Sequence, residues 1–592
     1  MELDKLNDEV TDEDVLIKID NLTVSTAEEK SWFKRKSLKP KTIILDKVSA
    51  CIKTGEFVAV IGPSGAGKTT FLVSLAGKNN LTSSGTITLN NTDVKNIPQG
   101  VVELVPQFDV FMEHMTVEEH LIFMTEMKLG SVKVSQNRRV LRSLIYDLKL
   151  KAIENNPIRT LSGGEKRLLS MATSLLSSPI VLICDEPTTG LDSYNATLVI
   201  SVLKKLSLTG KIIISSVHQP SSDLFKEFNT VCLMSEGKLL FYGSQNDCKS
   251  MFEKIKFPCP ATFNPAEFYI RAVSNGNRCI EMISENNCDP SVPCDLTGSR
   301  SLTLPLIRTC KRNWFKQIQL LLWRSSLSLK RDFRQYFLQL LFSMLISSTI
   351  IGTCYVGISG RTQRGVQDLR GFLWLMCSEI SFALAYVALY SFEGDLTLFK
   401  RERGLYTTSA FYICRFLSFI PRCVVWPILY VLIVTLALEL PNHILTAIEF
   451  AAALIITAIA STAYGLGMAA LFTSTGLMGD VMPCADLPLF IMSGAFIRLS
   501  SLPMWLMPIK YLSHFYYSMD AVSNIYWRQI DVIDCPSNST SMCYKDGIAV
   551  LKESGYSDNS IENYIGFTFI TVFWNLFGYY GLKREENKGY AY

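Results

Sequence analysis

Charged side chains are scarce in this sequence and unevenly distributed. They make up 19% of the 592 residues, against 48% hydrophobic residues, and the mean hydropathy is +0.21. About a quarter of the residues are charged in an average soluble protein, so this balance argues against a wholly soluble chain. Residues 1 to about 330 still alternate charges with short apolar runs, whereas long charge-free stretches follow Arg334. We therefore expect a partly membrane-embedded protein.

Three other features are absent. The net charge is only +4, which gives no reason to expect nucleic acid as a partner. The first residues, 1–9, are acidic and lack an apolar core, so no secretory signal peptide is visible and the N-terminal half is expected in the cytosol. Cys279, Cys288 and Cys294 lack the spacing of a zinc site.

A glycine-rich loop follows a short apolar strand, residues 56–61, and precedes a helical pattern. This is the context that a phosphate-binding loop requires, because glycines let backbone N–H groups turn toward phosphates. Lys68 would meet the β- and γ-phosphates of ATP, and Thr69 would hold Mg²⁺. A chance glycine-rich turn is the alternative, and the complete pattern argues against it. The predicted nucleotide-binding residues of this loop are Gly62, Pro63, Ser64, Gly65, Ala66, Gly67, Lys68, Thr69 and Thr70.

A second apolar strand, residues 181–184, ends in an acidic pair. Asp185 fits the carboxylate that organises Mg²⁺, usually through water. Glu186 is placed to polarise the attacking water as a general base. Such a pair could simply be solvated at the end of a strand, but the segment that follows, Pro187-Thr-Thr-Gly-Leu-Asp192, argues against this alternative.

These segments resemble the nucleotide-binding domain of ABC transporters. Leu161-Ser-Gly-Gly-Glu165 resembles the signature motif, which in this family contacts the γ-phosphate bound by the other cassette. Cys184 and the Lys166-Arg167 tail after the signature are small departures from the common pattern. The resemblance implies that Glu186, His218 (the switch histidine) and Gln107 (the Q-loop glutamine) are catalytic; that Thr69, Gln107 and Asp185 hold the metal; and that Ser162, Gly163, Gly164, Glu165 and the D-loop residue Asp192 contact nucleotide.

The signature motif also predicts stoichiometry. In this family ATP lies between the phosphate-binding loop of one cassette and the signature of the other, and this chain has one of each. The chain is therefore expected to pair with a second half-transporter. A homodimer would have two complete sites, and a heterodimer with a related half stays open.

Six charge-poor stretches are long enough to cross a bilayer, which takes about 20 residues as a helix. The segment before the first of them, residues 314–334, mixes apolar and basic residues and is expected to lie at the membrane surface. The basic residues between the second and third stretches favour a cytosolic side for the cassette and both termini, although Arg361, Arg364 and Arg370 then lie outside. The predicted spans are about 335–358, 371–392, 421–440, 450–473, 480–499 and 563–582.

An outer loop, residues 500–561, is expected between the last two spans. It contains the glycosylation sequon Asn538-Ser-Thr, so Asn538 is a candidate acceptor in a host that glycosylates. Cys535 and Cys543 flank the sequon and are candidates for a disulfide; bonding across a dimer and free thiols are the alternatives.

The cassette precedes the membrane half, and this order resembles the G subfamily, the White-type half-transporters. The resemblance rests on Ser215–Pro220, Asn264–Phe268, the coupling-helix segment Phe399–Glu402, and Ser493–Phe496. The expected architecture is an α/β P-loop NTPase cassette (residues 1–275, with a short N-terminal tail), a polar linker (276–305) and an all-α six-helix transmembrane domain (306–592).

By the same resemblance, substrate would enter a cavity lined by the second and fifth spans. Phe382 would stack on substrate, and Phe496 would help to close the outer end. Glu379 and Asp486 lie inside these spans, where an ionised group is costly unless it is paired or faces water. Our hypothesis is that both face the cavity and favour cationic substrates; the alternative is that one pairs within the bundle or reaches an interface.

The expected function is ATP-driven export of amphipathic small molecules or lipids across the bilayer by a dimer, with ATP and Mg²⁺ as cofactors. A lipid floppase or an importer is the first alternative, and a membrane regulator that uses ATP as a switch is the second. The plasma membrane is expected rather than an internal membrane.

Overall fold

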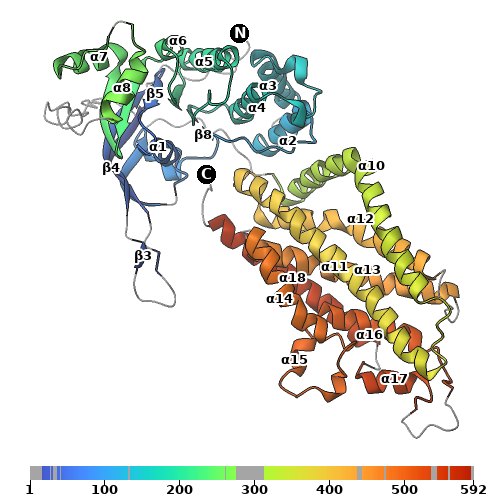
Figure 1. Ribbon diagram of the computed structural model, residues 1–592. Coiled ribbons are helices and arrows are strands. Elements are labelled where there is room, and N and C mark those ends of the chain that lie inside the picture. The colour runs from blue at the N-terminus through green and yellow to red at the C-terminus, as the bar shows by residue number, and fades with distance from the viewer. Residues whose placement is uncertain are drawn as a thin grey trace. The chain divides into compact units, whose positions relative to one another are not determined.

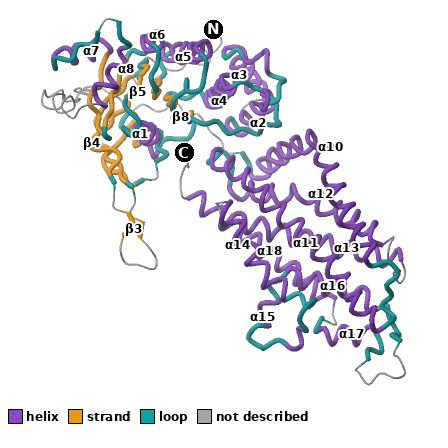
Figure 2. Tube along the Cα trace, in the orientation of Figure 1, coloured by secondary structure: helices purple, strands orange, loops and turns teal. Residues whose placement is uncertain are grey.

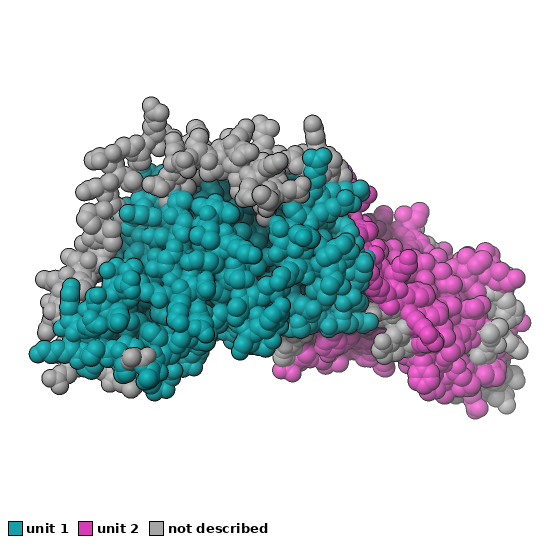
Figure 3. Space-filling model, turned by 90° about the horizontal axis from the view of Figure 1, so that it is seen from above, with its two compact units in different colours: residues 1–312, 588–592 teal, residues 313–587 magenta. Residues whose placement is uncertain are grey.

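The computed structural model divides the chain into two compact units, residues 1–312 with 588–592 and residues 313–587 (Figures 1 and 3). The described residues are 16–26, 29–30, 37–39, 42–79, 81–130, 134–260, 262–274, 312–435, 443–472, 475–534, 543–557 and 560–587.

A six-stranded sheet is the centre of the first unit (Figure 2). Its strands are rich in Val, Ile and Leu, and β5, β9, β10 and β11 are buried throughout, as expected for parallel strands covered on both faces. The order is β12-β11-β5-β10-β9-β8, parallel except for the edge strand β12. The bounds are β5 Phe57–Ile61, β8 Val102–Val105, β9 Val181–Cys184, β10 Ile212–Ser216, β11 Thr230–Ser235 and β12 Lys238–Ser244.

Two smaller antiparallel sheets complete the strands of this unit. The larger has the order β4-β1-β6-β7, and it shares a hydrophobic core with the central sheet, in which Leu45 and Val60 are fully buried. The bounds are β1 Leu16–Ser25, β4 Ile43–Lys53, β6 Thr82–Leu89 and β7 Thr92–Asp93, with β2 Glu29–Lys30 and β3 Ser37–Lys39 in the second small sheet.

The helices of the first unit begin at clear sequence signals. Thr116 and Ser162 are the N-caps of α2 and α4, and each forms a capping box with a glutamate three residues later. The α-helices are α1 Lys68–Leu75, α2 Val117–Lys128, α3 Val134–Asp147, α4 Gly163–Leu175, α5 Ser193–Leu208, α6 Ser222–Lys226, α7 Gln245–Lys254 and α8 Pro265–Ser274; the 3₁₀ helices are η2 Val94–Asn96, η3 Leu150–Ile153 and η4 Ile158–Thr160.

The second unit is helical in its described residues, and its long helices run side by side in Figure 1. Helix α13 packs against α11, α12, α16 and α18 and so lies centrally among them. The bounds are α10 Trp314–Cys354, α11 Gln363–Arg401, α12 Thr408–Thr435, α13 His443–Leu471, α14 Thr475–Ile491, η5 Leu499–Ser501, α15 Met507–Lys510, α16 His514–Trp527, α17 Gly547–Ser554 and α18 Ser560–Asn587.

Small residues on α13 allow its neighbours to approach closely. A Cβ atom on Gly465 would lie 2.2 Å from the backbone oxygen of Ala385 on α11, and one on Gly467 would lie 2.9 Å from the backbone oxygen of Trp574 on α18. Close backbone approach at small residues is how membrane helices gain packing energy.

This close approach predicts the effect of a single methyl group. Gly465→Ala is expected to destabilise the protein by about 1–3 kcal/mol, the usual cost of overpacking, because two helix backbones must separate. Gly394→Ala on α11 is the matched control, since a Cβ there meets nothing within 4 Å. Thermal unfolding of the purified proteins in detergent measures both variants. Equal midpoints for Gly465→Ala and wild type would contradict the close packing.

Each predicted membrane span coincides with a helix over most of its described length. Four helices, α11, α12, α13 and α18, are long and apolar enough to cross a membrane, and Leu341–Cys354 at the end of α10 is a shorter apolar stretch. This count covers only the described ranges. The surface segment predicted for residues 314–334 and the first predicted span form one helix, α10, and this helix bends (Figure 1).

The segment predicted to be an outer loop, residues 500–561, contains several helices within its described residues, and its side of the membrane stays a prediction. It contains α15, α17 and the 14-residue helix α16, nearly all of which is buried against α11, α13, α14 and α18. The charge-free criterion missed α16 because the helix has only 14 residues, fewer than the roughly 20 that a span requires, and it also contains Asp520. That carboxylate accepts hydrogen bonds from Asn524 Nδ2 (2.8 Å) and Ser557 N (3.2 Å), so a helix with a buried acid can still pack in the bundle.

The predicted modification sites of this segment are only partly described. Asn538 and Cys535 lie outside the described residues. Cys543 is disulfide-bonded, and its pairing with Cys535 stays a prediction.

Candidate nucleotide-binding and catalytic site

The predicted nucleotide-site segments follow the carboxyl ends of neighbouring parallel strands. The phosphate-binding loop follows β5, the acidic pair follows β9, Gln107 lies two residues after β8, and His218 lies two residues after β10. Carboxyl ends of parallel strands meet at one edge of a sheet, where ligands bind in open α/β folds. The structure thus brings segments up to 156 residues apart to one edge, as the count from Gly62 to His218 gives.

The phosphate-binding loop curls around the ammonium group of Lys68. Lys68 Nζ donates to the backbone oxygens of Gly62 (2.8 Å) and Pro63 (2.9 Å), and the side chain is 8% exposed. Burial lowers the pKa of Lys68, while the charges of Glu186 and Asp185 act in the opposite direction. A Cβ atom on Gly65, with φ of 81°, would meet nothing within 4 Å, so the loop leaves open space on that side.

Asp185 and Glu186 have separate hydrogen-bond partners. Asp185 is 4% exposed, and its Oδ1 accepts from Ser216 Oγ at 2.5 Å. Glu186 Oε2 accepts from Gln107 Nε2 (2.7 Å) and from Thr189 Oγ1 (3.0 Å). These contacts join the two predicted catalytic residues Glu186 and Gln107 within one chain.

The backbone at Glu186 is held in an unusual conformation. Its φ of 45° lies in the left-handed region, which a non-glycine residue adopts at a cost of about 1–3 kcal/mol where the surroundings enforce it. The Glu186 N–H donates to Ser216 Oγ at 2.8 Å, so one serine holds both members of the acidic pair. The strained turn directs the carboxylate toward Gln107.

The signature segment forms the N-terminus of helix α4. Ser162 is the N-cap of α4, and Glu165 Oε2 accepts from Ser162 N (2.8 Å) and Ser162 Oγ (2.9 Å). Glu165 therefore orders the cap rather than standing free for nucleotide. Ser162 and Gly163 are exposed at a helix N-terminus, a place suited to an anion. No hydrogen bond among the described residues joins Ser162 to the loop 62–70.

The predicted D-loop and switch residues lie at the surface of the unit. Asp192 is exposed at the N-cap of α5, and its Oδ1 accepts from Asn195 Nδ2 at 2.6 Å. A Cβ atom on Gly164 would lie 2.8 Å from Asn195 Cγ, so a glycine is needed where α4 meets α5. His218 and Thr69 are exposed.

The residues fit ATP with Mg²⁺. An open loop beside a buried lysine suits phosphates, and a hydroxyl, a carboxylate and an amide oxygen are hard donors of the kind that Mg²⁺ prefers. The described residues contain no cluster of three or more His, Cys, Asp or Glu that could hold a metal without further ligands. A site with few protein ligands is usual for Mg²⁺, because this ion keeps waters and substrate phosphates among its ligands.

Sequence reasoning missed Ser216 and Arg167. Arg167, on α4, is 4% exposed and donates to the backbone oxygens of Asp185 and Glu186, among others. Neither residue carries a motif of its own, although Ser216 immediately precedes Val217-His218. Cys184 behaves as an apolar strand residue, because burial raises the pKa of its thiol to about 12.

In the second unit, Asp486 is paired within its own bundle. Its Oδ1 accepts from Tyr464 OH (2.6 Å) on α13, and its Oδ2 accepts from Tyr386 OH (3.0 Å) on α11. Asp486 is buried, whereas Glu379 on α11 is half-buried. The geometry of Asp486 favours pairing within the bundle over the cavity-facing position expected from the sequence.

The predicted substrate aromatics belong to one cluster. Phe496 lies 4.9 Å from Phe490 and 5.5 Å from Trp374, measured between ring centroids, and Phe382 lies 6.3 Å from Phe490. Phe515 of α16 lies 5.0 Å from Phe382. The side chain of Phe496 is 61% exposed, so the cluster extends to the surface of the single chain.

The predicted coupling segment ends in a buried ion pair. Glu402 accepts from Arg324 Nη1 at 2.6 and 2.7 Å and from Tyr406 OH at 2.7 Å. Arg324 lies on α10, so α10 is fixed to the end of α11.

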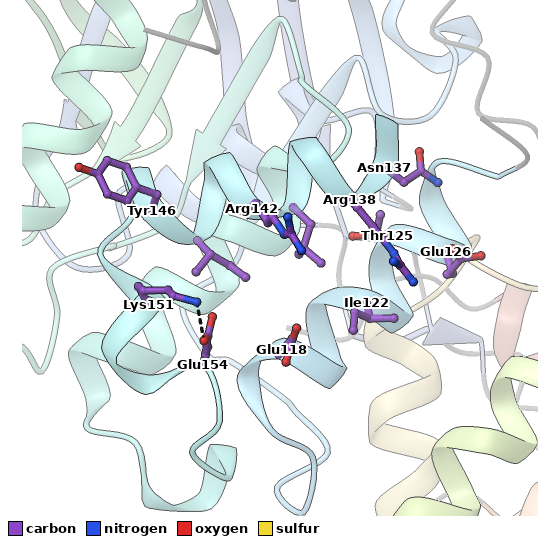
Figure 4. A pocket seen from close by; sticks show the side chains of 12 residues that line it. Glu118, Ile122, Thr125, Glu126, Asn137, Arg138, Arg142, Tyr146, Lys151 and Glu154 are labelled. Carbon is purple, nitrogen blue, oxygen red and sulfur yellow. Dashed lines mark hydrogen bonds and ion pairs between the residues drawn. The ribbon is translucent and has the colours of Figure 1, made fainter. Parts of the chain in front are cut away.

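A separate cavity of about 680 Å³ lies between α2 and α3 (Figure 4). Ile122 and Leu141 line it together with charged residues such as Arg138 and Arg142, and Lys151 Nζ donates to Glu154 Oε1 at 2.6 Å. None of the predicted nucleotide-site residues lines this cavity, so it is not the nucleotide site.

Comparisons with known proteins agree with this geometry. A family model described as ABC transporter matches residues 45–189, and one described as ABC-2 type transporter matches residues 316–527. Protein white of Drosophila melanogaster is 30% identical, over 93% of this chain and 84% of that protein. Protein scarlet of the same organism is 29% identical (92% and 86%), and ABC transporter G family member 25 of Arabidopsis thaliana is 27% identical (92% and 88%).

A P-loop site on an α/β sheet, joined in one chain to a domain of apolar helices, defines a membrane-transport ATPase. The chain belongs to the White-type G subfamily of ABC transporters, with the cassette N-terminal to the membrane domain. Its cassette binds ATP and hydrolyses it to drive transport across a membrane, and the chain is a multi-pass membrane protein. The family and the fold class predicted from the sequence are confirmed.

Proposed function

We propose that this chain is a half-transporter that dimerises and exports amphipathic small molecules or lipids. The observation that supports the dimer is the exposed N-terminus of α4: Ser162 and Gly163 are suited to an anion and, among the described residues, form no hydrogen bond with their own phosphate loop. Half of each ATP site is then supplied by a second chain. A homodimer accounts for this arrangement without a further component.

In the proposed mechanism the two cassettes close around nucleotide. Lys68 and backbone N–H groups of the loop 62–70 would bind the phosphates, and Thr69, Asp185 and Gln107 would hold Mg²⁺. The bound metal supplies neutralisation of the charge that develops on the phosphates. Glu186 accepts a proton from the attacking water, and Gln107, which bonds Glu186 at 2.7 Å, orients the carboxylate for that transfer. His218, two residues after the end of β10, would contact the γ-phosphate.

The membrane domain would carry substrate past the aromatic cluster of Phe382 and Phe496. Flat, apolar rings suit amphipathic molecules, which supports export of such compounds. The cassette and both termini are proposed to lie in the cytosol, and the membrane domain is proposed to span the plasma membrane. A floppase and an importer, which use the same cassette chemistry, are the alternatives that a transport assay distinguishes.

ATPase measurements on purified protein across a panel of lipids, sterols and cationic and neutral drugs test this function. We expect vanadate-sensitive hydrolysis that rises severalfold with one class of amphipathic compound. Substrate stimulation of the ATPase without ATP-dependent uptake of the substrate into inside-out vesicles would favour the regulator alternative. Transport in the reverse direction would identify an importer.

Variants of the two intramembrane acids test the proposed preference for cations. Glu379→Gln is expected to lower transport of cationic relative to neutral amphiphiles by about tenfold, the equivalent of one ~1.4 kcal/mol interaction. Asp486→Asn is the matched comparison and is expected to leave this ratio unchanged, because tyrosine hydroxyls already bond its carboxylate. A changed ratio of cationic to neutral transport in Asp486→Asn would indicate that Asp486 faces the cavity. An unchanged ratio in both variants would contradict the proposed preference for cations.

A further inference from the structure

Arg167 occupies the space between two strand ends of the catalytic edge. It lies on α4, two residues beyond the signature segment, and its guanidinium is buried. Strands β8 and β9 are parallel neighbours, with Val105 paired to Cys184 at their carboxyl ends. The next residues are Pro106 on one side and Asp185 on the other, and Arg167 reaches both.

On the β9 side the guanidinium binds the backbone that carries the acidic pair. Arg167 Nη2 donates to the backbone oxygens of Asp185 (2.8 Å) and Glu186 (2.9 Å), and Nε donates to that of Pro187 at 3.4 Å. Three successive carbonyl groups are thereby held by one side chain. This is the turn in which Glu186 has its left-handed φ of 45°.

On the β8 side the same group binds the segment that carries Gln107. Arg167 Nη1 donates to the backbone oxygen of Pro106 at 2.5 Å and to Asp109 Oδ2 at 3.3 Å. Pro106 and Asp109 flank Gln107, whose amide donates to Glu186. Both ends of the Gln107–Glu186 hydrogen bond are therefore attached to one guanidinium.

We propose that Arg167 is a positioning residue for ATP hydrolysis, which sets the place of Glu186 and Gln107 through their backbones. A guanidinium is suited to this task because it is planar and presents donors on several sides at once. The buried positive charge is offset by Asp109 and by the carbonyl dipoles. The inference rests on the proposed role of Glu186 as the general base.

The charge-conserving variant Arg167→Lys tests the proposal. A lysine ammonium is a point donor and cannot bond both strand ends together. We expect kcat for ATP to fall by about tenfold or more, because small misplacement of a catalytic group is costly, while KM changes by less than about twofold. The control is Arg159→Lys, since Arg159 is exposed and lies just before the signature segment.

A double-mutant cycle separates positioning from a merely structural role. If Arg167 acts through Glu186, then Arg167→Lys lowers the residual single-turnover rate of Glu186→Gln no further. A structural role predicts that the losses multiply, and that result would overturn the proposal. Equal kcat in Arg167→Lys and wild type would also overturn it, and would leave the function of Glu186 intact provided that Glu186→Gln is inactive.

A milder variant keeps the test decisive if Arg167→Lys folds poorly. Asp109→Asn preserves shape and weakens the attachment of Arg167 on the Gln107 side. We expect a loss of about threefold in kcat, again absent in the Glu186→Gln background, with an unchanged thermal midpoint. An Asp109→Asn protein with wild-type kcat would contradict the proposal.

Discussion

Glu186→Gln is expected to abolish ATP hydrolysis while ATP binding is retained. The amide cannot accept a proton from the attacking water, and loss of a general base costs about 10²–10⁴ in rate. The phosphate loop and Lys68 are untouched, so the affinity for nucleotide should change little. Steady-state ATPase and binding of a fluorescent ATP analogue measure the two effects on the same preparation.

Glu253→Gln is the matched control, because Glu253 is an exposed glutamate on α7. It should hydrolyse ATP at the wild-type rate. Hydrolysis in Glu186→Gln within about twofold of wild type would remove the assignment of Glu186 as the base.

Two individually inactive chains are expected to restore hydrolysis when they pair. Lys68→Met removes the phosphate-binding ammonium, and Ser162→Arg blocks the exposed N-terminus of α4. Homodimers of either variant have two damaged sites. In the mixed dimer both lesions fall on the same site, so the other is intact and about half the wild-type rate should return, given the twofold symmetry of such a pair.

Differently tagged chains, co-expressed and purified through both tags, provide the mixed dimer for this measurement. The matched control is a dimer in which both differently tagged chains carry Lys68→Met, purified in the same way. If the Lys68→Met and Ser162→Arg pair is as inactive as each homodimer, Ser162 and Lys68 do not complete one site across two chains.

Most of the nucleotide site could be predicted because the residues that bind nucleotide lie in short contiguous motifs. The loop 62–70 needs glycines for its turns and a lysine within reach, and both requirements fall within nine residues. The acidic pair is recognisable for a similar reason, since it directly follows an apolar strand. The left-handed φ of Glu186 could not be foreseen, because its cause lies in Ser216 and Arg167 on other elements.

The membrane domain was less predictable from local pattern. Long charge-poor stretches located the helices α11, α12, α13 and α18, but they missed the 14-residue α16, in which a buried Asp520 is bonded by Asn524 and Ser557. Asp486 shows the same limit. Its tyrosine partners are 100 and 22 residues away, so only the packing of α11, α13 and α14 shows that the charge is engaged.

The sequence by itself determined the class of this protein, its cassette and the residues that meet nucleotide, because each of those functions depends on particular side chains at short spacing. Only the tertiary structure decided how the catalytic carboxylate is held. Arg167 bonds backbone oxygens, which every residue has, so its partners at 106, 185, 186 and 187 leave no trace in residue type. A contact of that kind becomes visible only when the strands lie side by side.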